Sequence, residues 1–211
     1  MAELPVELTD DRVVAVLRAA SLRGTRQIVT ALVSSGIRCV ELTWTIENVL
    51  GHLAEAASVA GAVVGIGTVL YPEQAHAAVD AGAEFIVTPG VRPQVAAAAS
   101  ERRVPLVMGA WTPTEVAAAA DLSPAAVKLF PAETGGPAHL RSLRGPFGHL
   151  AFIPSGGVSA ATVGDWFRAG AIAVSAGSNV APPSALLAGD AVTVERNARH
   201  LMKAIDDSLP S

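Results

Sequence analysis

Cysteine is almost absent from the sequence, since Cys39 is the only one in 211 residues. One cysteine excludes an intramolecular disulfide and any metal site built from several thiolates. The five histidines are scattered and lack the i, i+4 spacing that places two ligands on one face of a helix. We therefore predict that the protein uses no catalytic metal and no other cofactor.

Charge is also sparse, because charged residues make up 16% of the chain and the formal net charge is -4, with a pI near 5.7. Without a basic field or a run of like charges, nucleic acid is not an expected partner. Residues 1–11 carry acidic side chains and no long apolar core, and no apolar run reaches the length of a membrane span. We expect no secretory signal, no membrane partner and, by default, a cytoplasmic location.

Hydrophobic residues are abundant, at 51% of the chain, which predicts an ordered core and leaves apolar surface for subunit contacts. Short β-rich runs alternate with alanine-rich helical segments, the signature of a parallel sheet built from βα units. The expected strands are Val13–Leu17, Cys39–Thr43, Val63–Gly67, Phe85–Thr88, Leu106–Met108, Val127–Phe130, Ala151–Pro154 and Ala173–Ala176.

Eight such strands, with no antiparallel stretch, predict a closed (β/α)₈ TIM barrel rather than an open doubly wound sheet. We expect one domain over residues 1–211, with an N-terminal extension at 1–11 and a C-terminal helical segment from about 186 to 211. Its last helix, roughly Ala191–Asp206, should pack across the outside of the barrel. Helix starts are predicted at Pro72, at Thr112 and at Ser159, and helix stops at the glycines Gly36, Gly82 and Gly170.

Lys128 is an unusual residue for its surroundings, because it lies inside the apolar run Ala125–Phe130. Burial disfavours the ammonium form, so the amine could become a nucleophile that forms a Schiff base with a carbonyl substrate. The alternative is a lysine at a strand end whose stem is packed and whose head reaches water. Glu41, on another strand, could be either a structural ion-pair partner for Lys128 or a proton shuttle.

Other polar residues close the expected strands at the end where a barrel has its active site. Strand alternation places Thr43 and Thr45 on the same face as Glu41. Thr68 could hydrogen-bond a small carboxylate or could be an ordinary turn residue. Arg18 could hold an anion or could be a solvated surface charge.

The turns after the last two strands contain Pro154-Ser155-Gly156-Gly157-Val158 and Ser175-Ala176-Gly177-Ser178-Asn179. Backbone N–H groups freed by these glycines could converge with a helix N-terminus on one point, which would make a phosphate site. Tight turns need glycine in any case, so either turn alone is weak evidence. Their pairing at strands seven and eight favours phosphate binding by Gly156, Gly157, Gly177 and Ser178.

In order along the chain, these segments resemble the KDPG/KHG aldolases. The matching segments are Ala15-Val16-Leu17-Arg18, Glu41-Leu42-Thr43, Gly65-Ile66-Gly67-Thr68-Val69, Thr88-Pro89-Gly90, Thr112-Pro113-Thr114-Glu115, Lys128-Leu129-Phe130-Pro131-Ala132, Pro154-Ser155-Gly156-Gly157-Val158 and Gly177-Ser178. Each segment is weak alone, whereas all of them in order are specific. The family consists of class I, Schiff-base lyases that cleave 2-keto-3-deoxy-6-phosphogluconate (KDPG) or 4-hydroxy-2-oxoglutarate (KHG) to pyruvate and an aldehyde.

The resemblance implies a role for each matching residue. Lys128 would be the Schiff-base lysine and Glu41 the general acid/base, while Thr68 would hold the pyruvate carboxylate with Arg18 nearby. The glycine turns with Ser178 would bind phosphate. We further expect Thr43, Thr45 and Phe130 to bind the substrate. The resemblance also implies a homotrimer of barrels.

Two departures from the family pattern concern the substrate. Many relatives follow the glutamate-x-threonine motif with leucine and a carboxylate-binding arginine, where this chain has Trp44 and Thr45. The usual proline-glycine ending of strand five is Met108-Gly109 here, followed by Ala110 and Trp111. We expect both changes to face the substrate pocket.

The open alternatives are KHG or the phosphogalactonate epimer as substrate, an isomerase or synthase on a similar barrel, and a catalytically silent phosphate-binding barrel.

Overall fold

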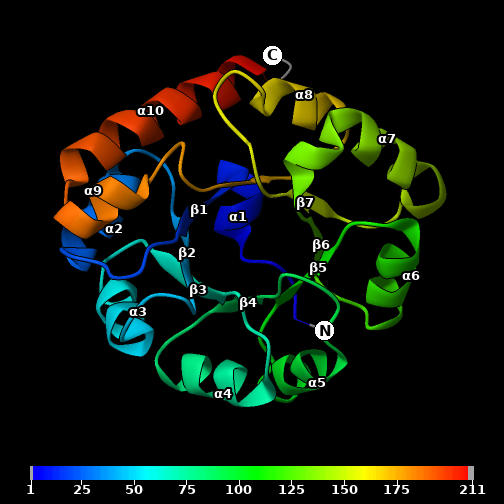
Figure 1. Cartoon of the computed structure of the whole chain (residues 1–211), viewed down its shortest axis with the longest axis horizontal. Helices are drawn as coiled ribbons and strands as arrows, with labels where there is room; N and C mark the ends of the chain where they lie inside the picture. The colour runs from blue at the N-terminus through cyan, green and yellow to red at the C-terminus, as the bar shows by residue number, and fades with distance from the viewer. Residues whose placement is uncertain (1, 209–211) are drawn as a thin grey trace.

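The computed structural model describes residues 2–208 and forms one barrel of eight parallel strands surrounded by helices (Figure 1). The strands pair in the order β7-β6-β5-β4-β3-β2-β1-β8, and a parallel bridge between Ser155 and Ser175 joins the two ends of the sheet. The predicted (β/α)₈ fold is confirmed. The strands are β1 (Val13–Leu17), β2 (Cys39–Thr43), β3 (Val63–Gly67), β4 (Phe85–Val87), β5 (Leu106–Ala110), β6 (Ala126–Leu129), β7 (Phe152–Pro154) and β8 (Val174–Ala176).

The helices after the strands form the outer ring in Figure 1. They are α2 (Thr25–Ser34), α3 (Val49–Ala57), α4 (Pro72–Asp80), α5 (Pro93–Glu101), α6 (Pro113–Asp121), the 3₁₀ turn η1 (Ala132–Thr134), α7 (Gly136–Phe147), α8 (Val163–Arg168), α9 (Pro183–Ala188) and α10 (Ala191–Ser208). As predicted, α10 packs on the outside of the barrel, against α2 and α8. No helix within residues 2–208 is long and apolar enough to cross a membrane.

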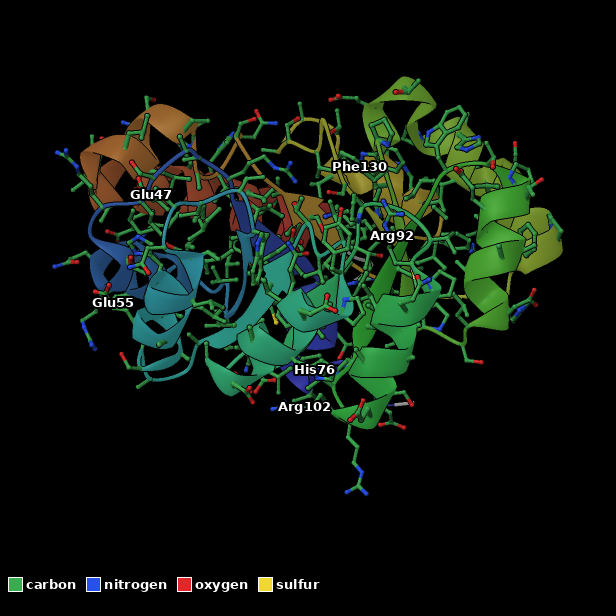
Figure 2. The ribbon with its side chains drawn as sticks, turned by 60° about the horizontal axis from the view of Figure 1, so that its bottom comes forward. Glu47, Glu55, His76, Arg92, Arg102 and Phe130 are labelled. Carbon is green, nitrogen blue, oxygen red and sulfur yellow. The ribbon has the colours of Figure 1, made fainter. Side chains whose placement is uncertain are left out.

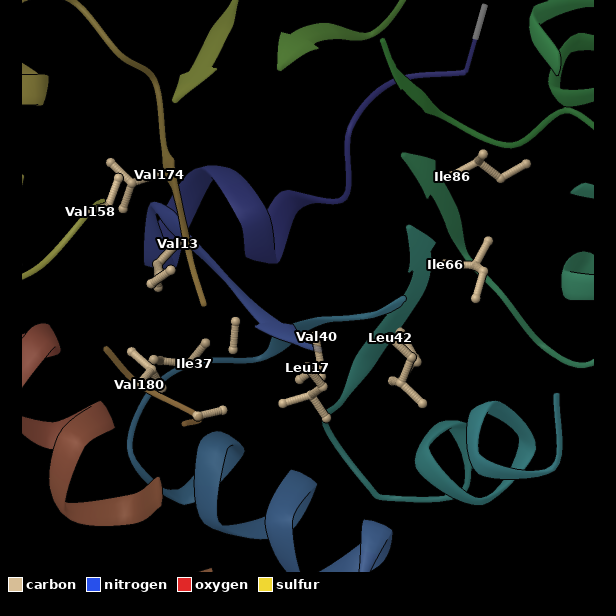
Figure 3. Packing of buried hydrophobic residues seen from close by; sticks show 14 of the residues in the cluster. Val13, Leu17, Ile37, Val40, Leu42, Ile66, Ile86, Val158, Val174 and Val180 are labelled. Carbon is tan, nitrogen blue, oxygen red and sulfur yellow. The ribbon is translucent and has the colours of Figure 1, made fainter. Parts of the chain in front are cut away.

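Side chains alternate between two hydrophobic cores because successive strand residues point to opposite faces of the sheet. The larger core lies between the strands and the outer helices, and Figure 3 shows Leu17, Leu42 and Ile66 among its members. The smaller core fills the inside of the barrel and includes Val14 and Phe85. A parallel sheet covered on both faces therefore explains strands that are buried along their whole length.

The N-terminal extension is in part a helix, α1 (Val6–Asp11), that the sequence did not predict. Its Leu8 is fully buried in the inner core, so α1 closes the N-terminal end of the barrel (Figure 1). The Asp11 carboxylate accepts hydrogen bonds from the backbone N–H of Arg38 at 2.9 Å and from its guanidinium at 2.6 Å. This ion pair fastens α1 to the chain just before β2, and it raises the pKa of Arg38 above its usual range.

Most expected boundaries agree with the structure, and the first three strands agree to the residue. Strand β4 ends at Val87 rather than at Thr88, and β6 ends at Leu129 rather than at Phe130. Gly36, Gly82 and Gly170 all have positive φ, as predicted for helix stops.

Helix α8 has the expected bounds, Val163–Arg168, but the start signal predicted at Ser159 was wrong, because Thr162 immediately precedes the helix. The Ser159 carbonyl instead accepts from the backbone N–H of Val163, which closes a turn ahead of the helix. Residue 1 and residues 209–211, which belong to the expected terminal segments, lie outside the described residues.

Candidate active site

Lys128 and Glu41 meet inside the barrel. The Lys128 Nζ lies 3.4 Å from each carboxylate oxygen of Glu41, and the two residues are 3% and 0% exposed. They come from β6 and β2, which are separated in the sheet by three other strands, so only closure of the barrel brings them together. Burying an ion pair costs desolvation energy that the attraction between the two charges does not always offset. Stability alone is therefore a poor explanation for this pair.

Two glycines of β3 make room for side chains inside the barrel, Gly67 for Glu41 and Gly65 for Phe85. A Cβ on Gly67 would lie 1.9 Å from Oε1 of Glu41, so the carboxylate occupies the space that a side chain would need. A Cβ on Gly65 would lie 2.3 Å from the ring of Phe85, which fills the barrel at the level of Glu41. These glycines therefore serve the packing around Glu41.

The threonines predicted near Glu41 lie at the same end of the barrel. The hydroxyls of Thr43 and Thr45 are 2.8 Å apart, which confirms that the two side chains share a face, and Thr43 donates to the Leu17 carbonyl at 3.2 Å. Thr68 has a positive φ of 61°, an uncommon conformation for a threonine. Arg18 donates from Nη2 to the Thr68 hydroxyl at 3.5 Å, so these two predicted anion contacts are neighbours.

A cavity of about 240 Å³ opens at the C-terminal ends of β1, β6, β7 and β8. The residues that line it include Arg18, Phe130, Gly156, Gly157, Gly177 and Ser178, so all four predicted phosphate contacts lie in one place. Figure 2 shows Phe130 and Arg92 toward this end of the barrel and His76 and Arg102 toward the other end. Gly156 and Gly157 have φ values of 103° and 71°, a consecutive pair that glycine adopts at little cost.

Lys128 and Glu41 are not themselves in the lining of this cavity, but they adjoin it. The Phe130 ring centroid is 5.7 Å from the Lys128 Nζ, and Val16, the strand partner of Glu41, also lines the cavity. The structure therefore places an amine and a carboxylate beside a cavity that has an arginine and a glycine-rich wall.

The comparisons with known proteins agree with this geometry. The family model for KDPG and KHG aldolases matches residues 5–197. The chain belongs to the KDPG and KHG aldolase family. It is 35% identical over 198 residues to the KHG/KDPG aldolase of Escherichia coli K12, covering 93% of each chain. It is also 35% identical over 185 residues to the 2-dehydro-3-deoxy-phosphogluconate aldolase of Dickeya dadantii, covering 87% of each chain. A solved KDPG aldolase from Zymomonas mobilis superposes with a TM-score of 0.86 at 27% identity, covering 95% of this chain and 96% of that one.

In this family member the two tryptophans expected at the substrate pocket point elsewhere. Trp44 follows Thr43 on the opposite face and packs against the outer core, and it does not line the 240 Å³ cavity. Trp111 stacks on His139 of α7 with ring centroids 4.6 Å apart. The expectation was therefore wrong for Trp44, which strand alternation turns outward, whereas Thr45 of the same departure shares the inner face with Thr43. Trp111 follows Ala110, the last residue of β5, and is not among the residues that line the cavity.

The predicted helix N-terminus at the phosphate site also needs correction. Helix α9, which follows β8, begins at Pro183, and this proline lines the cavity but has no N–H to donate. Helix α8 begins at Val163, several residues beyond Gly157, and no residue of α8 lines the cavity. Neither helix therefore presents a first-turn N–H group among the residues that line the cavity, whereas residues of the glycine turns do line it.

Sequence reasoning missed three polar residues of the cavity: Glu133, Ser155 and Asn179. Each stands within or next to a motif that was recognised, so adjacency to those motifs was the available signal. Asn179 donates to the Val158 carbonyl at 2.8 Å and so ties the two glycine turns together. Glu133 packs on Gly157, where a Cβ would come within 2.7 Å of the Glu133 Cβ.

Cys39 lies inside the barrel, on β2 two residues before Glu41. It is fully buried, and burial raises the pKa of its thiol to about 12. Among residues 2–208 no group of three or more histidine, cysteine, aspartate or glutamate side chains could hold a metal ion.

Proposed function

We propose that the protein is a class I aldolase that cleaves a 2-keto-3-deoxy sugar acid, KDPG in the first place, to pyruvate and glyceraldehyde 3-phosphate. The observation that carries this proposal is the buried contact of 3.4 Å between Lys128 and Glu41 in a member of an aldolase family. An amine nucleophile and a carboxylate proton shuttle are the two groups that Schiff-base aldol chemistry requires.

In the proposed reaction, the Lys128 amine attacks the C2 carbonyl, and Glu41 transfers protons while the carbinolamine loses water to form an iminium ion. Glu41 then removes the proton of the C4 hydroxyl, the C3–C4 bond breaks, and its electron pair moves toward the iminium nitrogen. The aldehyde leaves, and C3 of the remaining enamine takes up a proton. Hydrolysis of the resulting pyruvate iminium releases pyruvate and restores Lys128.

Substrate binding is proposed for the residues around this pair. Arg18 and Thr68, 3.5 Å apart, would hold the pyruvate carboxylate, and the hydroxyls of Thr43 and Thr45 would complete that end of the pocket. Phe130 would pack beside the bound substrate. The phosphate would lie in the cavity lined by the glycine turns and Ser178, with hydrogen bonds from backbone N–H groups.

A borohydride trapping experiment tests the nucleophile. The chain contains only two lysines, Lys128 and Lys203, and Lys203 is exposed and paired with Asp207. Incubation with pyruvate forms the imine, and borohydride delivers hydride to its C2 carbon, which should leave one 1-carboxyethyl group that peptide mapping assigns to Lys128. Lys128→Ala should abolish the adduct and Lys203→Ala should keep it. Labelling that persists in Lys128→Ala would refute the assignment.

The role of Glu41 needs a separate variant. Glu41→Gln keeps the shape of the side chain but removes the proton shuttle, so it should retain some trapping and lose about 10²- to 10⁴-fold in kcat. Turnover equal to that of the unmodified protein would remove Glu41 from the mechanism.

KHG and the phosphogalactonate epimer of KDPG are the alternative substrates. The E. coli relative is named for both KHG and KDPG, which favours testing the unphosphorylated acid as well. A kcat/KM panel over the three acids distinguishes them, and a protein that turns over none but still binds phosphate would be the silent barrel.

We also propose a homotrimer. The outside of the barrel exposes apolar side chains, including Tyr71 at 61% and Val192 at 75%, that an assembly could bury. Light scattering should give three times the chain mass of 21.4 kDa, and a monomer mass would refute this arrangement.

A further inference from the structure

Trp111 is held in a fixed position at the end of β5, outside the substrate cavity. Its backbone N–H donates to the Glu115 carboxylate at 3.0 Å, and its carbonyl accepts from Nε2 of His139 at 2.8 Å. Because a carbonyl can only accept, Nε2 of His139 must carry the hydrogen. The indole also stacks on the imidazole, with an interplanar angle of 27°. Contacts from two helices, α6 and α7, thus fix both the backbone and the ring of Trp111.

The fixed indole contacts residues 130–133, the segment that follows β6. Its Nε1 donates to the Pro131 carbonyl at 3.1 Å. Pro131 stands between Phe130 and Glu133, and both of these residues line the substrate cavity. The indole N–H therefore bonds the backbone of a segment that forms one wall of the cavity.

The same segment is anchored on its other side. The backbone N–H of Ala132 donates to the carbonyl of Ser155, which itself lines the cavity, at 2.8 Å. The backbone N–H of Phe130 also donates to the Ala110 carbonyl at 3.2 Å. Residues 130–133 are thus held by hydrogen bonds to the end of β5, to the glycine turn after β7 and to the indole of Trp111. Of these three anchors, only the indole is a side chain, so it can be removed without altering the backbone.

We propose that Trp111 is a positioning residue for the aldehyde half of the substrate, and that His139 orients it. Loss of the indole N–H leaves the Pro131 carbonyl with only the 3.4 Å bond from the Thr134 N–H of the same turn. No group outside the segment then holds this carbonyl, so Phe130 and Glu133 shift in the cavity wall. Lys128 precedes the segment within β6 and is ion-paired with Glu41, so the pyruvate half does not depend on the indole. This inference rests on the proposed aldolase function.

Trp111→Phe tests the inference, because phenylalanine keeps an aromatic ring next to His139 but removes the N–H. We expect the KM for KDPG to rise about three- to tenfold, the range that one hydrogen bond is worth, with kcat changed less than about twofold. Exchange of the pyruvate methyl protons in deuterium oxide, which needs no aldehyde, should stay within about twofold. Trp44→Phe is the matched control: it removes an indole N–H outside the cavity and should change none of these values.

Amide hydrogen exchange gives a second measurement that needs no substrate. The peptide covering residues 130–136 should exchange faster in Trp111→Phe than in the unmodified protein or in Trp44→Phe. The Pro131 carbonyl loses its bond to the indole, so the adjoining bond from the Ala132 N–H to the Ser155 carbonyl should open more often. His139→Phe keeps a stacked ring but removes the donor to the Trp111 carbonyl, so the same changes should appear at smaller size. It also provides the test if Trp111→Phe does not fold.

The outcomes separate the two proposals. An unchanged KM, or methyl exchange that falls as much as cleavage does, overturns the positioning role, because a general structural defect affects both halves of the reaction. Unchanged amide exchange in residues 130–136 overturns it as well. A lack of pyruvate labelling in the unmodified protein would instead refute the Schiff-base proposal, which the amide-exchange experiment does not use.

Discussion

Gly67 should be essential for catalysis, because the Glu41 carboxylate occupies the place where any other residue would carry its Cβ. Gly67 faces the inside of the barrel from β3, and the Glu41 side chain lies across its α-carbon. In Gly67→Ala the new Cβ would lie 1.9 Å from Oε1 and 2.4 Å from Cδ of Glu41. Non-bonded heavy atoms require about 3.5 Å, so the carboxylate has to move by more than about 1 Å.

The side chain of Glu41 should yield before the backbone does, because a carboxylate is the far end of a flexible chain. Both of its oxygens are now 3.4 Å from the Lys128 Nζ, and a shift of about 1 Å destroys that arrangement. Misplacement of this size costs about 10²-fold in rate, and complete loss of acid/base catalysis costs up to about 10⁴-fold. The barrier to turnover should therefore rise by about 3 to 5 kcal/mol. The loss of stability should be smaller, about 1 to 3 kcal/mol, as in other overpacked cores.

The assay is exchange of the pyruvate methyl protons with deuterium oxide, followed by NMR, because it depends on the Schiff base and the proton shuttle but on no aldehyde. Gly145→Ala is the control: a Cβ at this position of α7 meets no atom within 4 Å, so exchange should be unchanged. Thermal unfolding shows whether each variant is folded. A folded Gly67→Ala protein that exchanges pyruvate within about threefold of the unmodified rate would refute the reasoning.

Three further predictions concern the frame of the barrel. Asp11→Ala removes the acceptor of the Arg38 backbone N–H and leaves the guanidinium only its 3.5 Å contact with Asp10, so urea unfolding should show a loss of about 2 kcal/mol; no measurable loss would contradict the anchoring of α1. The pKa of Glu115 is lowered, chiefly because the backbone N–H of Thr112 donates to its carboxylate. This hydrogen bond to the ionised carboxylate stabilises the folded protein above the ordinary pKa near 4.5, and the stabilisation is lost on acidification. From about pH 6 to about pH 3 the Tm of the unmodified protein should thus fall more than that of Glu115→Gln, and equal slopes would disprove it. Cys39, with its pKa raised to about 12, should resist iodoacetamide at about pH 8 until the protein unfolds, and full labelling of the folded protein would show the thiol to be accessible.

Much of the fold follows from local pattern, and three strands show why. Runs such as Cys39–Thr43 and Val63–Gly67 are bounded by turn residues and alternate with helical segments, so their ends could be predicted to the residue. Helix α1 was missed because its six residues are too few to show a helical period, and only the open end of the barrel makes Leu8 a core residue.

Burial and strand alternation also predicted that Lys128 and Glu41 would meet, and motif order predicted that the glycine turns would share a site. The surroundings of the two tryptophans could not be predicted from their places next to the motifs. Trp44 is turned outward by alternation, and Trp111 is drawn to His139, a partner on α7 that no local motif connects with it.

The sequence by itself therefore determined the alternating strands and helices, the presence of one lysine in an apolar run, and the family. Local propensity and hydrophobic period carry that information, and they act over a few neighbouring residues. Only the tertiary structure decided that Gly67 leaves the space for Glu41, that Gly65 leaves the space for Phe85, and that Trp111 supports Pro131. Such fits join strands and loops far apart in the chain, and they exist only once the barrel has closed and side chains from different strands compete for the same volume.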